Sequence, residues 1–76
     1  MRGTNAEVIE YTAAEGMPVT RKPLKDISFP DGAIVGGVIR NDEAFVAVGE
    51  TQILPGDRVA VFAAPESLKA IDKLFK

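Results

Sequence analysis

The chain has 76 residues and a formal net charge of −2, and it contains no cysteine and no histidine. This composition excludes disulfides, the usual zinc ligands, and catalysis by a cysteine nucleophile or a histidine base. The interspersed charges argue against a nucleic-acid-binding surface, and the apolar runs are far too short to enter and cross a bilayer. A chain of this size buries only about 60% of its unfolded surface, so a second subunit is the stabilising device that remains.

The sequence is assigned to a single domain. Residues 1–5 are polar and are expected to form a disordered or cloning-derived tail, so the domain is placed at residues 6–76. The N-terminus lacks the charged and then apolar pattern of a signal peptide. A cytoplasmic protein, or a fragment of one, is therefore expected.

The first half of the domain predicts one strand and one short helix. Residues 6–12 alternate between two sets of side chains and are rich enough in β-branched and aromatic residues to form a strand. Residues 19–27 predict a short helical turn that begins at Thr20 as its N-cap. The sequence Phe-Pro-Asp-Gly at 29–32 predicts a turn that leads into the next strand.

Residues 33–48 predict a β-hairpin. Its two central residues, Asn41 and Asp42, suit a type I′ turn because both residue types tolerate positive φ. Pairing the strands around that turn sets Arg40 opposite Glu43 and carries the second strand to Val48.

Both faces of this hairpin are apolar, which is unusual for an antiparallel sheet with one solvated face. Strict alternation along the first strand sets Ile34, Gly36 and Val38 on one face and Val35, Gly37 and Ile39 on the other. The adjacent glycines indicate a bulge or room for a large neighbour such as Phe45 or Phe62. The alternative is that they give a partner chain or a small ligand access to the backbone.

The last third of the chain predicts a turn, a strand and a helix. Residues 54–57 fit a type II turn, with Pro55 second and Gly56 third, where φ must be positive. Residues 58–63 follow as a strand, and an amphipathic helix begins at Pro65, with Leu68, Ile71 and Phe75 as its apolar stripe. The order β-α-β-β-β-α predicts an α+β two-layer sandwich with a roughly four-stranded, mostly antiparallel sheet.

Few residues are candidates for chemistry. Asp57 and the other carboxylates near turns are expected to be solvated or to accept local hydrogen bonds, so no catalytic residue, metal ligand or enzymatic activity is predicted. No phosphate-loop or dinucleotide glycine pattern occurs. The best polar binding candidate is Arg40, because a guanidinium at a hairpin end can pair with a phosphate. The alternative for Arg40 is a cross-strand ion pair with Glu43.

Several segments follow one another in a distinctive order between residues 6 and 75. They are RKPLKDI at 21–27, Phe-Pro at 29–30, the strand 33–40 that ends in an arginine, and LPGDRV at 54–59. Together they resemble the C-terminal subdomain of RCK regulators (TrkA-C, or RCK_C), the TrkA-type subunits of bacterial potassium uptake systems, and related domains on cation antiporters. The chain departs from that pattern at Arg21, where the family usually has a glycine.

The resemblance implies a homodimerisation module, which would cover an apolar sheet face. In some family members cyclic di-AMP or another small ligand binds at the dimer interface. By position, Ile34, Arg40 and Asn41 would line such a site here, with Arg40 as the phosphate partner. The resemblance also places an NAD(H)- or ATP-binding Rossmann subdomain upstream in a longer protein, so this fragment itself carries no such cofactor.

Two functions are therefore considered. The first is a regulatory, ligand-sensing and dimerising module of a cytosolic subunit that controls a membrane potassium or cation transporter. Such a subunit would be cytoplasmic and peripheral to the inner membrane through the transporter, without inserting into the membrane itself. The second is a stand-alone, small β-rich binding or structural module with no role in transport.

Overall fold

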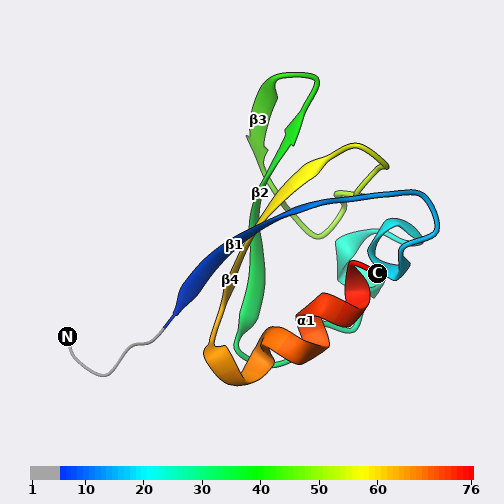
Figure 1. The fold of residues 1–76 in the computed structure, drawn as a ribbon. Coiled ribbons are helices and arrows are strands. Elements are labelled where there is room, and N and C mark those ends of the chain that lie inside the picture. Colours follow the sequence, from blue (N-terminus) through cyan, green and yellow to red (C-terminus); the bar gives the residue numbers. More distant parts are fainter. Residues whose placement is uncertain (1–5) are drawn as a thin grey trace.

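The computed structural model describes residues 6–76, which form one antiparallel sheet and one short α-helix joined by loops and 3₁₀ turns (Figure 1). The expected tail at residues 1–5 lies outside this range. The strands are paired in the order β1-β4-β2-β3. Their bounds are Glu7–Thr12 for β1, Ala33–Arg40 for β2, Glu43–Val46 for β3 and Arg58–Ala63 for β4. Helix α1, Leu68–Leu74, packs on one face of the sheet, which confirms the two-layer α+β fold.

The short helix expected at residues 19–27 is replaced by two separate 3₁₀ turns, η1 at Pro18–Thr20 and η2 at Leu24–Asp26. Pro23 has extended backbone angles, and a proline also disfavours helical angles in the residue before it, so one continuous helix cannot form. Thr20 is therefore not an N-cap. It ends η1, and its hydroxyl donates a hydrogen bond of 2.8 Å to the carbonyl of Met17.

The hairpin turn forms as the sequence predicts. Asn41 and Asp42 have φ values of 52° and 67°, as a type I′ turn requires, and Arg40 lies opposite Glu43. The second strand is shorter than expected, because β3 ends at Val46.

The end of β3 has a local cause. The backbone N–H of Val48 donates to the hydroxyl of Thr51 at 3.0 Å, and the N–H of Thr51 donates back to the carbonyl of Val48 at 2.9 Å. This reciprocal pair turns the backbone of Val48 away from β2. The chain then runs toward η2 and does not continue the sheet.

A bulge at Gly36 changes which residues of β2 face the core. The pairing with β4 shifts by one residue between Val35 and Gly37, so strict alternation is interrupted there. Val35 and Val38 are consequently both buried, and the expectation that they lie on opposite faces is wrong. A Cβ atom at Gly36 would lie 2.4 Å from the ring of Phe62, which confirms that the glycine makes room for a large neighbour.

The hydrophobic core lies between the sheet and α1. The expected helix stripe is confirmed, since Ile71 and Phe75 are buried and Leu68 packs against them from the edge. The buried apolar residues are Ala13, Val19, Val35, Val38, Ile53, Val59, Val61, Ala63, Ile71 and Phe75. They come from the strands, the loops and the helix, so the core closes only when all of these elements are in place.

Tyr11 connects the edge strand β1 to the C-terminal end of α1. Its ring stacks on Phe75 with centroids 4.1 Å apart and an interplanar angle of 8°, and its hydroxyl donates a hydrogen bond to the carboxylate of Asp72. Burial, and then the neighbouring Asp72 carboxylate, raise the pKa of Tyr11 to about 12.

Tyr11 is the only tyrosine in the chain, so its ionisation can be followed directly by ultraviolet absorbance. We expect a midpoint about 2 pH units above that of the denatured chain, because the folded structure disfavours the phenolate. Asp72→Asn should lower the midpoint only part of the way, since burial persists. A folded protein that titrates at the ordinary value of 10 would contradict this arrangement.

Candidate functional site

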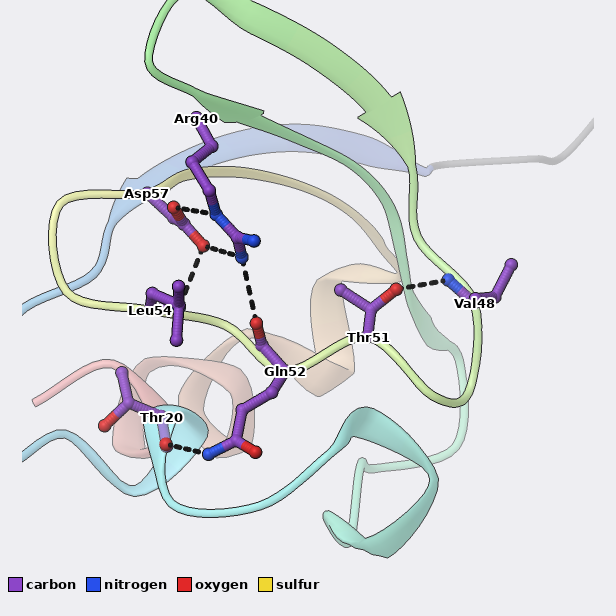
Figure 2. Close-up of polar contacts among 7 residues, drawn as sticks. All are labelled: Thr20, Arg40, Val48, Thr51, Gln52, Leu54 and Asp57. Atoms are coloured by element: carbon purple, nitrogen blue, oxygen red, sulfur yellow. Dashed lines mark hydrogen bonds and ion pairs between the residues drawn. The ribbon is translucent and has the colours of Figure 1, made fainter.

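An ion pair with a buried carboxylate joins the end of β2 to the start of β4. The Arg40 Nε donates to Oδ1 of Asp57 at 2.9 Å, and its Nη2 donates to Oδ2 at 2.7 Å (Figure 2). This fork-to-fork geometry is the strong form of an arginine–carboxylate pair. The alternative pairing of Arg40 with Glu43 is therefore wrong, although the two residues are opposite one another in the hairpin.

Asp57 is 2% exposed, so of the two expectations for this turn carboxylate solvation is wrong, whereas a local hydrogen bond, accepted from the Leu54 N–H, is confirmed. The type II turn at 54–57 explains its position: Gly56 has the positive φ of 93°, and the N–H of Asp57 donates to the carbonyl of Leu54 at 3.0 Å. The Asp57 carboxylate in turn accepts the Leu54 N–H at 2.8 Å. An aspartate at the fourth position of a Pro-Gly turn was the sequence signal for this site.

The pair shifts the ionisation of both partners. Hydrogen bonding from Arg40 lowers the pKa of Asp57 below its ordinary value, with a further contribution from the Leu54 N–H and against the opposing effect of burial. The same contact raises the pKa of Arg40. Asp57 therefore stays ionised at acidities that protonate ordinary carboxyl groups.

This lowered pKa predicts a loss of stability in acid. Because the folded pKa of Asp57 lies below the ordinary value of 3.8, its contribution is complete above that value and is lost as the pH falls through the folded pKa. The free energy of unfolding, measured by urea denaturation, should fall steeply below about pH 4. Asp57→Asn should flatten this dependence, and an unchanged slope would contradict the assignment.

The ion pair also holds the connection between β3 and β4. The Arg40 Nη2 donates to the carbonyl of Gln52 at 2.9 Å, and the Gln52 side chain donates to the carbonyl of Thr20 at 3.0 Å (Figure 2). A salt bridge of 3.0 Å between Lys25 and Glu50 joins the same two segments. The strand end, the connection and the 3₁₀ turns thus form one hydrogen-bonded unit.

Of the three expected ligand residues, the single chain brings only two together. Arg40 and Asn41 adjoin at the hairpin turn, where Asn41 is exposed. Ile34 is 63% exposed at the other end of β2, about 20 Å away along a strand. It lies opposite the exposed Phe62, whereas Arg40 points to the side of the sheet that holds Asp57.

The sheet face that α1 leaves uncovered, termed here the outer face, is mainly apolar. Val46 is 76% exposed and Phe62 is 44% exposed, and the polar residues gather at one corner around an Arg58–Glu10 ion pair. The apolar members of the outer face are Val8, Ile34, Gly37, Ile39, Ala44, Val46, Ala60 and Phe62. A contiguous exposed apolar surface of this kind usually marks an interaction site.

Residues within the described range 6–76 line hollows beside the outer face. The first has a volume of about 360 Å³, lies over the glycine bulge and Ala60, and is bordered by the Arg58–Glu10 pair. The second has a volume of about 240 Å³, and Ile34, Val48 and Lys25 are among its lining residues.

Within residues 6–76, no group of three acidic side chains is placed to hold a metal ion. No helix in that range has the length and apolar character needed to cross a membrane.

Comparison with known proteins gives consistent matches. The chain is 43% identical over 76 residues to the Trk system potassium uptake protein TrkA homolog 2 of Methanosarcina mazei, covering all of this chain and 17% of that protein. It is 35% identical over 69 residues to the K(+)/H(+) antiporter NhaP2 of Shewanella baltica, covering 91% of this chain and 12% of the antiporter. The chain thus spans less than a fifth of the length of these relatives.

A solved structure described as that of an RCK domain with cda has the same fold. It superposes with a TM-score of 0.75 at 26% sequence identity, covering 91% of this chain and 97% of the other. The sequence profile of the TrkA-C domain matches residues 8–76, which is nearly the whole chain. The chain therefore belongs to the TrkA-C domain family.

Proposed function

We propose that this domain is a non-catalytic regulatory module that dimerises, senses a small ligand and thereby controls a potassium or other cation transporter. Family membership supports the regulatory role, since the relatives named above are a potassium uptake protein and a K(+)/H(+) antiporter. The observation that most supports dimerisation is the exposed apolar surface of the outer face, which includes Ile34, Val46 and Phe62. Burying such a surface is favourable by about 25 cal/mol per Å².

The proposed ligand is a cyclic dinucleotide, with cyclic di-AMP as the first to test. Two nitrogens of the Arg40 guanidinium bind Asp57 and Gln52, and the third, Nη1, has no hydrogen bond within the described residues. That nitrogen can donate to a phosphate while Asp57 keeps the guanidinium oriented. The solved structure of similar fold is described as an RCK domain with cda, and this description supports testing a bound small molecule on this fold.

The positions of the candidate residues favour a ligand shared between two chains. Since Ile34 and Arg40 lie about 20 Å apart on opposite sides of β2, a compact ligand that contacts both residue types has to take them from different copies. A ligand that bridges two chains stabilises one dimer geometry over others, and attached domains would pass that shift on to the transporter. The complete protein would then be cytoplasmic and held at the membrane by its transporter, with any NAD(H) or ATP site in another domain.

The test combines sedimentation of the chain over a concentration series with calorimetric titration of cyclic di-AMP. We expect a concentration-dependent dimer that tightens with the ligand, and about tenfold weaker binding for Arg40→Lys, which keeps the charge but loses the fork. Glu43→Ala is the control, because Glu43 is exposed and makes no ion pair with Arg40.

Two results would count against the proposal. A monomer that binds no cyclic dinucleotide would favour the alternative of a stand-alone β-rich module without a role in transport. Unchanged affinity in Arg40→Lys would show that Arg40 does not bind the ligand, and it would not bear on the proposed dimer.

A further inference from the structure

Two segments bring basic residues to the end of the molecule where α1 stops. Arg21 and Lys22 follow η1, while Lys73 and Lys76 belong to the last turn of α1 and the residues after it. Helix α1 packs against η1, so the two segments lie side by side (Figure 1). All four residues are exposed, and none of them makes an ion pair within residues 6–76. This end therefore carries positive charge that no contacting carboxylate neutralises, although the whole chain has a net charge of −2.

An open hollow with a volume of about 230 Å³ lies between the same two segments. Arg21, Lys22 and Ser28 border it as hydrogen-bond donors, and Ile27 and Leu74 add apolar surface. It shares no lining residue with the hollows beside the outer face. Because Leu74 belongs to α1, this hollow is separate from the sheet face that α1 leaves uncovered.

The Arg21 guanidinium is oriented by the loop that precedes η1. Its Nη2 donates to the carbonyl of Gly16 at 3.2 Å, and Gly16 has a φ of 90°, which a glycine adopts without strain. The Nε and Nη1 atoms of Arg21 make no hydrogen bond to any described residue. The same holds for the Lys22 ammonium and the Ser28 hydroxyl in this part of the chain. Three neighbouring donor groups therefore border one hollow without an acceptor.

We propose that this hollow binds a phosphate monoester, with Arg21 and Lys22 as its cationic ligands and Ser28 as a hydroxyl donor. A phosphate monoester carries close to two negative charges near neutral pH and three strong acceptor oxygens, which match two cations and a hydroxyl. The planar guanidinium can bind two of these oxygens, and the lysine acts as a point charge. The volume lies below the range of about 300–1,000 Å³ of typical ligand pockets, which favours a phosphorylated molecule of a few carbons. This site goes beyond the dimer and the cyclic dinucleotide proposed above.

Asp26 limits the affinity of the hollow for an anion. It is among the lining residues and makes no ion pair with another described residue, so its carboxylate repels a bound phosphate. The hollow is also open to solvent, where dissolved salt screens charges. A dissociation constant in the millimolar range is therefore expected for inorganic phosphate. Removal of the Asp26 charge should tighten the binding.

The test is a titration of the isotope-labelled chain with inorganic phosphate, followed by changes in the NMR chemical shifts of the backbone amides. Sodium chloride at equal ionic strength is the reference, because it screens charges without offering an oxyanion. We expect saturable shift changes that are confined to residues 18–28 and the end of α1. Changes that sodium chloride reproduces, or that never saturate, would overturn the proposal.

Three charge variants and a matched control make the test specific. Arg21→Gln and Lys22→Gln are each expected to weaken phosphate binding about threefold, and Asp26→Asn should tighten it by a similar factor. The control is Lys25→Gln, which removes the same charge from the same segment. The Lys25 ammonium binds Glu50 at 3.0 Å and lines a hollow beside the outer face, so its loss should leave the affinity unchanged. Equal weakening in Lys22→Gln and Lys25→Gln would overturn the site.

Two further probes distinguish the sources of the phosphate group. Glycerol 3-phosphate in solution represents a metabolite, and phosphatidylcholine vesicles that contain phosphatidic acid represent a lipid headgroup. Binding of either probe that Lys22→Gln weakens and Lys25→Gln does not would support the site and identify its source. The substituted residues are exposed, so the variants should stay folded, which thermal unfolding checks. If Arg21→Gln disturbs the loop at Gly16, Lys22→Gln still decides the outcome, because the Lys22 side chain makes no ion pair with a described residue.

Discussion

Asp57→Ala is expected to lower the free energy of unfolding by about 3 kcal/mol, the largest effect of any polar substitution in this domain. The substitution removes both hydrogen bonds of 2.7 and 2.9 Å to Arg40 and leaves a charged guanidinium half-buried without its partner. It also removes the acceptor of the Leu54 N–H, so the turn before β4 keeps only its backbone hydrogen bond from residue 57 to the Leu54 carbonyl. Urea denaturation at neutral pH, where Asp57 is ionised, measures the change.

The control for this prediction is Glu43→Ala. Glu43 lies opposite Arg40 in the hairpin and is exposed, so its removal should change the free energy of unfolding by less than about 0.5 kcal/mol. Equal losses in the two variants would mean that Arg40 draws its stabilisation from the hairpin and not from the turn at 54–57. Asp57→Asn, which keeps the volume, should lie between the two because the amide retains one acceptor oxygen.

The second large effect is expected for Val38→Ala, at about 2 kcal/mol. Val38 is 1% exposed and packs in the core between the sheet and α1, so truncation removes buried methyl groups and leaves a small cavity. The matched variant is Ile34→Ala on the same strand, where a larger side chain is removed from an exposed position. Measured on dilute, monomeric protein, it should cost less than about 0.5 kcal/mol.

This pair of variants tests the bulge at Gly36. With strict alternation along β2, Val38 and Ile34 would share a face and lose similar stability on truncation. The one-residue shift between Val35 and Gly37 separates them, and a large difference between the two losses is its thermodynamic signature. Similar losses would show that the strand is regular in solution.

Most of the fold could be predicted from local sequence patterns. The type I′ turn at Asn41 and Asp42, the type II turn that needs positive φ at Gly56, and the stripe of Ile71 and Phe75 all depend on residues a few positions apart. Such features can be predicted from short segments of sequence, because turn angles and helix faces follow from local sterics and periodicity. The hairpin register, with Arg40 opposite Glu43, followed directly from the turn.

Of the three errors in the fold, one arose where a distant segment decides the outcome, and two have local causes. The adjacent glycines of β2 correctly indicated a bulge or a large neighbour, but the strict alternation assumed along β2 fails at Gly36, where the Phe62 ring of β4 lies over the backbone. The helix expected at 19–27 was a local error, since the effect of Pro23 on the preceding residue was visible in the sequence. The end of β3 at Val46 depends on the hydrogen bonds that Val48 makes with Thr51.

The sequence by itself determined the fold class, the turns, the amphipathic helix and the presence of more apolar surface than one helix can cover. It also identified Arg40 as the polar residue of interest. Only the tertiary structure decided that Arg40 binds Asp57 and not Glu43, and that the register shift at Gly36 places both Val35 and Val38 in the core. The physical reason is that an ion pair and a strand register depend on strands brought together from distant parts of the chain, whereas turns and helix faces depend on near neighbours.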